Sequence, residues 1–527
     1  MTTEHQSFFE WEDENPLLKL IPLNISFSSM GLLLAHDPKV LWEGENIEES
    51  RLPRLIGRIR RVFIVTKIAV EFALQFFELL IEGLEARDPR LEKNRSRIFD
   101  TGRFKGKALS DLPWFSDSAA GMVVEGITGV AKTFILKRVL SLIPQTCAHA
   151  ASPEYGWHSL TQLIYLVVPM PSSSRQGAFL LDVVLGMDKV LGTSYADSFR
   201  SRDYSDDKRA VLVLHWLSAH RCGALIVEEC QERNLPSSVF GSEFLSLFLR
   251  AMNWGIPVVV LGNPKALSTI KTFTQDGRRF SVGHWFTMEP VWDFRSNIWA
   301  KDLIPGIWEW SPMNGKDEHI PNRDYYLWKK TGGIPDFLVL LRKESLKNAA
   351  RLGRDFVTMT DIEAAYRGRA MMANHPLIEA LTTFDPMKLS RLTDVPADAI
   401  LKRWIELGFL VVQQVTTPES APAKGSASAA SPTQSSSESA PAVQSAPNTA
   451  AAPEGDKRPT RTRAPKRLAP TPSPTGIADA DAGDGGGQSA KPSGSEDASP
   501  PDHAAPDQHI DRRSAAYRHL FTQRPKD

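Results

Sequence analysis

Cysteine and net charge are both scarce in this sequence of 527 residues. Its three cysteines, Cys147, Cys222 and Cys230, are too few for a disulfide framework and have no metal-ligand spacing. We therefore expect a reducing, cytoplasmic location. Lys+Arg and Asp+Glu both number 62, so the net charge is zero and binding to nucleic acid through bulk charge is excluded. Any DNA contact must depend on local basic groups.

Long uncharged hydrophobic runs are absent as well. The most apolar stretch, residues 62–83, is interrupted every three or four residues by Lys67, Glu71, Gln75 and Glu78. This spacing places the polar side chains on one face, which predicts a buried amphipathic helix rather than a membrane span. The acidic start of the chain has neither a basic nor an apolar signal-peptide region, so no signal peptide is expected.

Aromatic residues are missing from the segment between Thr416 and Ala516, where Ala, Pro, Ser, Gly and Asp dominate. Such a composition predicts a disordered tail over residues 414–527. Six basic side chains lie within 457–467, and the stretch from 479 to 511 is mostly acidic. Tyr517, Leu520 and Phe521 then return at helical spacing, which indicates a short docking motif at the end of a tether.

The remaining chain has enough apolar residues for a large core, since 42% of the sequence is hydrophobic. Short apolar runs alternate with helical patterns, which predicts an α/β fold with a parallel five-stranded sheet. The predicted strands are 122–124, 163–168, 224–227, 256–262 and 285–288. We expect a helical extension over residues 1–110, the sheet domain over 111–322 and a helical lid over 323–413. Thr360 and Glu363 have capping-box spacing, which predicts a helix start there.

A phosphate-binding loop is predicted where GITGVAKT follows a strand and opens a helix. In this context the backbone N–H groups wrap phosphates, Lys132 reaches the β/γ oxygens and the Thr133 hydroxyl binds Mg²⁺. Ala131 departs from the pattern, because glycine usually precedes the lysine. The alternative is a glycine-bearing turn before a core helix. The nucleotide-binding candidates are Gly126, Ile127, Thr128, Gly129, Val130, Ala131, Lys132 and Thr133.

Two acids end the predicted strand at 224–227. In a nucleotide-hydrolysing sheet the first, Glu228, holds Mg²⁺ and the second, Glu229, polarises the attacking water. The usual first residue is Asp, and Glu228 is one methylene longer. The alternative is a strand that simply meets solvent at its end.

Further candidates follow the next strands. Asn263 comes after the strand at 256–262, where its amide can orient water, although Gly-Asn-Pro is also a strong turn signal. Arg278 and Arg279 precede the last strand, where one of them can reach a neighbouring subunit's nucleotide as an arginine finger. A solvated basic turn is the alternative for these arginines.

In their order along the chain, these motifs resemble the AAA+ ATPases of bacterial DNA transposition, the TniB/TnsC-type regulators. The resemblance covers residues 115–385 and includes GITGVAKT, LIVEECQ, VVVLGNPKA, RRFSVGHWFTMEP, TGGIPDFL and TDIEAAYRGRAMMANHPLIEAL. It implies an AAA+ P-loop fold and ATP-dependent homo-oligomers, as a ring or filament, on duplex target DNA. It also implies recruitment of transposase subunits, contact with a target-selection protein, and hydrolysis that dismantles the assembly. Asp336 stands where many AAA+ proteins carry a second-sensor arginine.

Two local sites are candidates for DNA contact. Arg175 follows three serines before a predicted helix, a loop that the resemblance favours; serine capping of the helix is the alternative. Lys402 and Arg403 lie in residues 388–412, which look like a helix-turn-helix, although a plain helical hairpin often has similar spacing.

Two other functions remain open for the whole chain. One is another ATP-driven DNA-remodelling enzyme such as a helicase loader, and the other is a nucleotide-switched scaffold that does not hydrolyse ATP.

Overall fold

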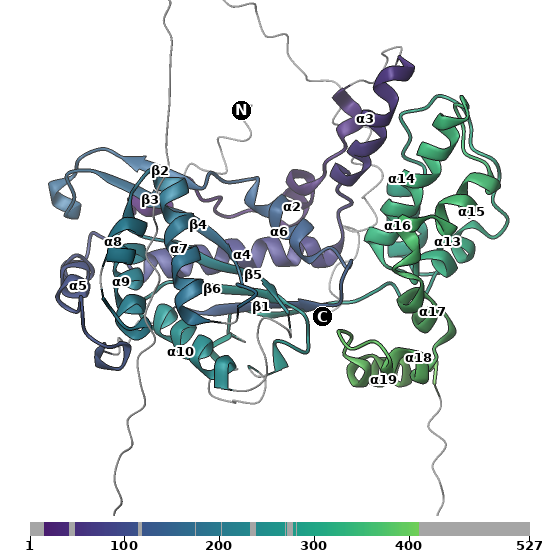
Figure 1. Ribbon diagram of the computed structural model, residues 1–527. Helices are drawn as coiled ribbons and strands as arrows, with labels where there is room; N and C mark the ends of the chain where they lie inside the picture. Colours follow the sequence, from purple (N-terminus) through teal and green to yellow (C-terminus); the bar gives the residue numbers. More distant parts are fainter. Residues whose placement is uncertain are drawn as a thin grey trace, which may run out of the picture. The chain divides into compact units, whose positions relative to one another are not determined.

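A five-stranded parallel sheet forms the centre of the fold (Figure 1). The computed structural model describes residues 15–41, 48–113, 119–173, 175–201, 203–231, 239–268, 270, 278–280 and 282–410. The strands are β1 (Gly121–Gly126), β4 (Tyr165–Pro169), β5 (Ala224–Cys230), β6 (Val258–Gly262) and β7 (Trp285–Met288), in the order β4-β5-β6-β1-β7. The predicted α/β class with a parallel sheet is confirmed.

The strand expected at 163–168 is divided in two. Leu163 ends β3 (Leu160–Leu163), which pairs antiparallel with β2 (Thr146–His149) in a separate two-stranded sheet. After Ile164 the chain begins β4, so the apolar run serves two sheets. The sequence did not predict this small sheet, because polar residues such as Gln162 interrupt the alternation that marks a strand.

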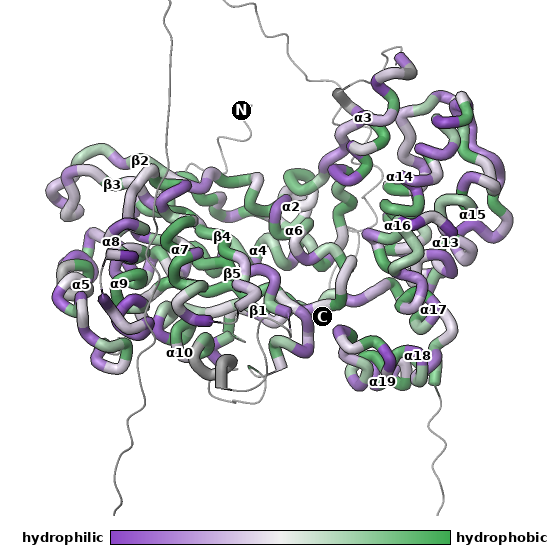
Figure 2. Tube along the Cα trace, viewed as in Figure 1, coloured by the Kyte–Doolittle hydropathy of each residue, from purple (hydrophilic) through white to green (hydrophobic). Residues whose placement is uncertain are grey.

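Both faces of the central sheet are buried, as its continuous apolar strands require. Successive residues of β1 alternate between the two cores: Met122 and Val124 pack with α4 (Lys67–Glu85), and Val123 packs on the opposite side. The opposite core includes side chains of α7 (Gln176–Leu191), α9 (Asp206–Ala219) and α10 (Val239–Asn253). Figure 2 shows the strands mainly in the green of hydrophobic residues.

The apolar stretch at 62–83 forms helix α4, which begins at Lys67, five residues later than the apolar run. Thr66 caps the helix by accepting a hydrogen bond from the Ala69 N–H group at 3.4 Å. The buried face includes Phe72, Phe76 and Leu80. None of the helices in the described part of the chain combines the length and hydropathy that crossing a membrane requires.

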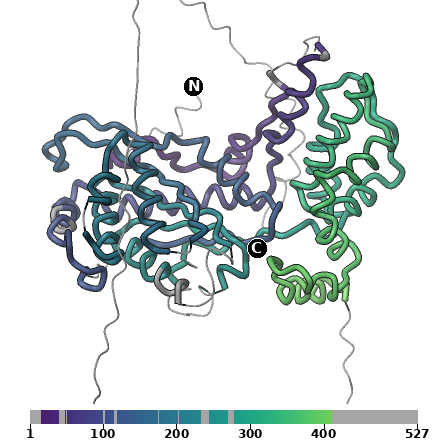
Figure 3. The backbone as a smooth tube through the Cα atoms, in the orientation of Figure 1, coloured from purple at the N-terminus to yellow at the C-terminus, as the bar shows by residue number. Residues whose placement is uncertain are grey.

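Helices dominate the rest of the described chain, which can be followed in Figure 3. Before the sheet lie α2 (Phe27–Leu34), α3 (Leu52–Ile56), α5 (Glu92–Arg103) and the short 3₁₀ segments η1 (Pro16–Leu18), η2 (Pro38–Leu41), η3 (Glu49–Arg51), η4 (Gly57–Arg61) and η5 (Leu109–Asp111). Within the sheet region lie α6 (Lys132–Leu140), η6 (Pro153–Tyr155) and α8 (Tyr195–Ser201). After it come the π-helix η7 (Ile298–Trp308), α13 (Arg323–Thr331), α14 (Pro335–Arg351), α15 (Met359–Arg367), α16 (Arg369–Met372), α17 (His375–Thr383), α18 (Pro386–Ser390) and α19 (Ala397–Glu406).

The capping box predicted at Thr360 and Glu363 lies two residues earlier in the structure. Thr358 is the N-cap of α15, and its N–H group donates to Asp361 Oδ2 at 2.9 Å while its hydroxyl accepts from the Asp361 N–H group. Both pairs have suitable spacing. Thr358 and Asp361 are selected because Arg354 also binds the Asp361 carboxylate with two hydrogen bonds of 2.7 Å.

The tail expected over residues 414–527, with its basic run at 457–467 and its docking motif at Tyr517, Leu520 and Phe521, lies outside the described residues.

Candidate active site

The predicted phosphate loop joins β1 to α6. Two of its residues, Gly129 and Ala131, have positive φ angles of 87° and 71°. Glycine takes this conformation freely, whereas the methyl group of Ala131 makes it cost about 1–2 kcal/mol. The departure noticed in the sequence therefore falls on a left-handed residue, the N-cap of α6. The loop keeps the strand–loop–helix geometry in spite of that cost.

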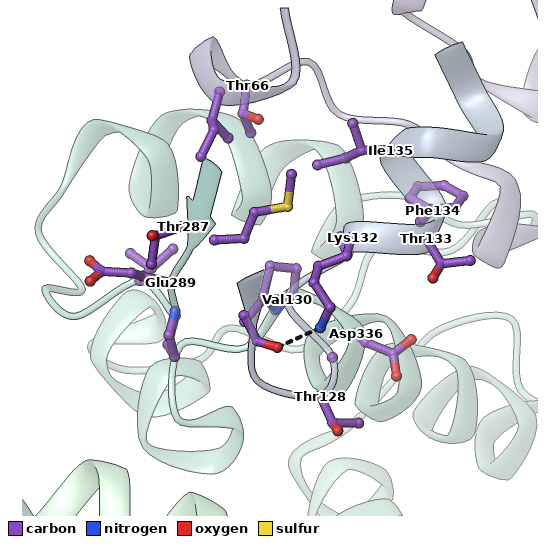
Figure 4. A pocket seen from close by; sticks show the side chains of 18 of the residues that line it. Thr66, Thr128, Val130, Lys132, Thr133, Phe134, Ile135, Thr287, Glu289 and Asp336 are labelled. Atoms are coloured by element: carbon purple, nitrogen blue, oxygen red, sulfur yellow. Dashed lines mark hydrogen bonds between the residues drawn. The ribbon is translucent and has the colours of Figure 1, made fainter. Parts of the chain in front are cut away.

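Lys132 lies over this loop (Figure 4). Its ammonium group donates hydrogen bonds to the carbonyl oxygens of Gly126 at 2.6 Å and Ile127 at 2.9 Å. Burial lowers the pKa of Lys132 to about 8, while the negative charge of Glu229 acts in the opposite direction. The site thus contains a partly buried cation that gains from any further anionic partner.

A cavity of about 1820 Å³ opens beside the loop. It is bordered by the loop at the end of β1, by the residues that follow β5 and β6, and by parts of the chain before and after the sheet. The sequence-predicted residues in its wall are Gly126, Thr128, Gly129, Val130, Ala131, Lys132, Thr133, Glu229 and Asn263. These residues meet because the carboxyl ends of parallel strands share one edge of the sheet.

A bulge near the end of β5 separates the two predicted acids. Val227 pairs with Val260 and Cys230 with Gly262, so three steps along β5 match two steps along β6. Glu229 has a φ of 57° at this bulge, lines the cavity and accepts a hydrogen bond from Gln231 Nε2 at 2.6 Å. Glu228 instead borders a smaller cavity of about 350 Å³ beside Lys137 of α6. The two carboxylates therefore occupy different environments.

Glu228 lies close to the hydroxyl of Thr133. Burial raises the pKa of the Glu228 carboxyl, and the Lys137 charge and a hydrogen bond with the Thr133 side chain partly oppose this. Its Oε1 atom is buried without a hydrogen-bond partner among the described residues. The Thr133 hydroxyl and the Glu228 carboxylate, with its one unsatisfied oxygen, suit Mg²⁺, which takes few protein ligands and retains water or phosphate oxygens. In the described ranges no three His, Cys, Asp or Glu residues form a metal-binding group.

Asn263 contacts the helical region that follows the sheet. Its side-chain amide nitrogen donates to the carbonyl oxygen of Asp394 at 2.5 Å, and its Oδ1 accepts from the Lys265 N–H group at 3.1 Å. The second contact is the turn expected from Gly-Asn-Pro. Lys265 Nζ donates to the Thr393 carbonyl. The amide considered for orienting water is thus held by the segment between α18 and α19.

The start of α14 touches the phosphate loop. The Asp336 N–H group donates to the Gly129 carbonyl at 3.2 Å, and a Cβ atom on Gly129 would lie 2.7 Å from Ile334 Cγ2. The Asp336 side chain lines the cavity, at the position where many AAA+ proteins carry a second-sensor arginine. Burial raises its pKa, while Arg60 and Lys343 lower it.

Arg278 and Arg279 are not among the residues that line the cavity of their own chain. Arg278 is exposed and Arg279 is half-buried. Both lie in a short helical segment, 278–280, before β7. Their position leaves open the contact with a neighbouring subunit for which they were considered.

The three predicted DNA-contact residues lie at separate places. Arg175 is exposed and is the N-cap residue of α7, with no side-chain capping bond. Lys402 is exposed on α19. Arg403 on the same helix pairs with Glu289 Oε2 at 3.1 Å and with Glu406 Oε2 at 3.2 Å. Arg403 is thus paired with a residue directly after β7, whereas Lys402 is exposed.

Sequence reasoning missed much of the cavity wall. Residues Arg60, Val62, Phe63, Ile64, Thr66 and Ile68 line it from the segment before the sheet. Phe63 lies 5.3 Å, centroid to centroid, from the ring of Phe134 on α6. No local motif marks this segment, because tertiary packing alone brings it to the loop.

No family model matches this chain, and no curated protein is similar to it. Solved structures with a similar arrangement include the Aeropyrum pernix ORC2 protein in ADPNP–ADP complexes, at 12% identity and a TM-score of 0.33, over 60% of this chain and 87% of that one. Another is Cdc6p from Pyrobaculum aerophilum, at 13% identity and a TM-score of 0.35, over 62% of this chain and 88% of that one. A third is the A. pernix ORC1 protein in complex with DNA, at 16% identity and a TM-score of 0.35, over 63% of this chain and 83% of that one. These likenesses are too distant to transfer a function to this chain.

Proposed function

We propose that this chain is an AAA+ ATPase that binds and hydrolyses ATP in the cavity at the carboxyl edge of the sheet. One observation carries the proposal: the partly buried Lys132 ammonium and the Glu229 carboxylate face a single large cavity beside a loop with two left-handed residues. A cation and loop N–H groups bind a polyphosphate, and a nearby carboxylate can accept a proton from water.

In this proposal Lys132 exchanges its two loop carbonyl partners for phosphate oxygens. Thr133 and Glu228 would hold Mg²⁺, which would neutralise charge at the phosphates when bound. Glu229 takes the proton from the attacking water. Asn263 orients that water after leaving the Asp394 carbonyl, and Arg278 or Arg279 of a neighbouring subunit stabilises charge that develops on the phosphate.

We further propose that the ATPase regulates DNA transposition. The support is the sequence resemblance over residues 115–385, which includes motifs beyond those of the ATPase class. ATP-bound chains would form a ring or filament on duplex target DNA, meet a target-selection protein and recruit transposase subunits, and hydrolysis would release the assembly. In this scheme residues 111–322 are the ATPase domain, 323–413 the lid and 414–527 a tether.

A nucleotide-switched scaffold that hydrolyses ATP slowly or not at all is a second candidate. The hydrogen bond from Asn263 to Asp394 favours it, because an amide held in this way is not available to position water. Ala131, where glycine is usual, also has a left-handed backbone conformation that its methyl group disfavours.

Steady-state ATPase activity of the full chain, measured with and without duplex DNA, distinguishes these functions. The ATPase proposal expects turnover that Lys132→Ala removes. Nucleotide binding without turnover, in both conditions, would support the scaffold instead. Electron microscopy with duplex DNA and a slowly hydrolysed ATP analogue should show rings or filaments; isolated monomers would contradict the assembly.

A further inference from the structure

Five arginines lie within eleven residues before the sheet. The sequence from 51 to 61, RLPRLIGRIRR, has no acidic residue; Arg51 ends η3, and the other residues form α3 and η4. This concentration of charge belongs to a chain with no net charge, and of the five arginines only Arg60 lines the proposed ATPase site. Its place in the fold is therefore informative.

The apolar and basic residues of this segment occupy different sides. Leu55, Ile56 and Ile59 are buried at 4%, 0% and 0% exposure. The arginines at 51, 54, 58 and 61 follow one another at intervals of three, four and three residues, which places them along one side of the consecutive helical segments η3, α3 and η4. We call these four residues the basic face. Arg54 and Arg61 are exposed.

A second row of positive charge lies alongside. Helix α14 packs against α3 and η4, and the two run side by side in Figures 1 and 3. Lys343, Lys347 and Arg351 follow at intervals of four residues along α14. Burial lowers the pKa of Lys343, and the charges of Arg60 and Lys347 lower it further. Glu344, which pairs with both lysines, offsets only part of this charge.

We propose that the basic face binds the phosphate backbone of duplex DNA. The inference rests on the proposed function for its biological setting but on these residues for its chemistry. The face extends over about 15–20 Å, since each residue advances a helix by roughly 1.5–2.0 Å. Duplex DNA carries about one negative charge per 1.7 Å of its axis, so such a row can meet several phosphates at once.

The chemistry around the face favours a polyanion over a lipid surface. No large apolar residue between 48 and 61 is exposed, whereas binding to a membrane interface needs such side chains beside the basic ones. Contacts that involve guanidinium groups and phosphates alone carry no base information. Recognition at this face is therefore independent of DNA sequence.

The same segment also reaches the nucleotide cavity. Arg60 lines that cavity together with Asp336, whose pKa it lowers. Its neighbours Arg58 and Arg61 belong to the basic face, so a single helical turn carries both contacts. DNA bound at the face would fix the position of Arg60 beside the nucleotide, which gives DNA a direct way to change ATP turnover.

The test compares the full-length double variant Arg54→Gln/Arg61→Gln with wild type. Fluorescence anisotropy gives affinity for two short duplexes of unrelated sequence across a salt series. Loss of two phosphate contacts should reduce the slope of log K against log salt by about 1.8 for both duplexes. Arg54→Lys/Arg61→Lys should retain the wild-type slope. The matched control is Arg200→Gln/Arg369→Gln, which removes two exposed arginines from α8 and α16.

An unchanged slope in the folded Gln variant would overturn the inference, as would an equal reduction in the control. Binding of phosphatidylserine vesicles that depends on these arginines, with DNA affinity unchanged, would also overturn it. ATPase activity without DNA is measured in parallel. If wild type hydrolyses ATP but binds neither duplex, the DNA-binding inference fails and the ATPase proposal stands; if it binds DNA through this face without hydrolysis, the reverse holds.

Discussion

Asn263 and Asp394 are joined by a 2.5 Å hydrogen bond, although 131 residues separate them along the chain. The donor is the amide at the end of β6, and the acceptor is a backbone carbonyl in the turn before α19. Lys265 contacts the preceding carbonyl, of Thr393, and Arg403 pairs with Glu289, the residue after β7, at 3.1 Å. Three contacts thus hold the α18–α19 segment against the edge of the sheet where hydrolysis is proposed.

Arg403→Gln should weaken this attachment and raise basal ATP turnover. A partly exposed ion pair contributes about 0.2–1 kcal/mol, so we expect an increase of up to about fivefold as Asn263 is released more often. Steady-state ATPase assays without DNA measure it. Lys402→Gln is the matched control, since it removes the adjacent exposed charge. Equal losses of DNA affinity in both variants, with turnover unchanged, would instead favour the helix-turn-helix interpretation.

ATP affinity should fall as pH rises through about 8. Burial holds the pKa of Lys132 near 8, so above this pH the free protein loses the proton that phosphate binding requires. Each further pH unit then costs up to about tenfold in affinity, because binding must restore the proton. Nucleotide titrations from pH 7 to 9.5 measure the effect. Lys132→Arg should flatten the profile and Lys132→Ala should bind ATP poorly throughout; a Lys132→Arg profile as steep as wild type would assign the titration to another group.

Glu229→Gln should retain nucleotide and Mg²⁺ binding but lose about 10²–10⁴-fold in hydrolysis, because an amide does not accept the proton of water as a carboxylate does. Complexes on DNA should then persist longer with ATP. Single-turnover hydrolysis and nucleotide affinity separate the two steps. Glu228→Gln should weaken Mg²⁺ binding instead. If Glu228→Gln alone abolished hydrolysis, the roles of the two acids would be reversed.

Arg278→Ala or Arg279→Ala should reduce turnover only where subunits meet, since neither residue lines the cavity of its own chain. Mixing experiments provide the measurement. Glu229→Gln protein can lend its arginines without hydrolysing ATP, so adding it should restore turnover to an arginine variant. Absence of rescue at every ratio, with assembly intact, would show that neither arginine acts across the interface.

Deleting residues 415–527 should leave ATPase activity and DNA assembly largely intact, because this segment offers few apolar side chains to a core. Transposase recruitment should decrease instead. Deleting 512–527 should weaken transposase binding without changing DNA affinity, and neutralising 457–467 should lower the salt dependence of DNA binding. Wild-type transposition by the full deletion would place the docking surface on the folded part.

Local patterns were sufficient to predict the strands of the central sheet and the loop that joins β1 to α6. Buried parallel strands are continuous apolar runs. A glycine-bearing loop with a lysine, placed between a strand and a helix, is likewise recognisable from neighbouring residues alone. Contacts between distant segments have no such signature. The wall formed by residues 60–68 and the bond between Asn263 and Asp394 arise only when the chain packs.

Ambiguity also arose where two local patterns competed. Thr358/Asp361 and Thr360/Glu363 both have capping-box spacing, and the interaction of Arg354 with Asp361 decides between them. Likewise, the spacing of Lys402 and Arg403 on one helix does not reveal that Arg403 faces Glu289. Side-chain partners from other elements determine such outcomes.

The bulge in β5 makes the number of residues, as well as their chemistry, a constraint on this site. The additional residue brings the Cys230 carbonyl into position to accept a 2.8 Å hydrogen bond from the Asn263 N–H group. Substitution of Glu228 or Glu229 can leave this pairing in place. Deletion of either would shift Cys230 by one position and turn the following side chains to the opposite face. Related chains with this sheet should therefore conserve the length of the segment between Val227 and Cys230 as well as the two acids within it.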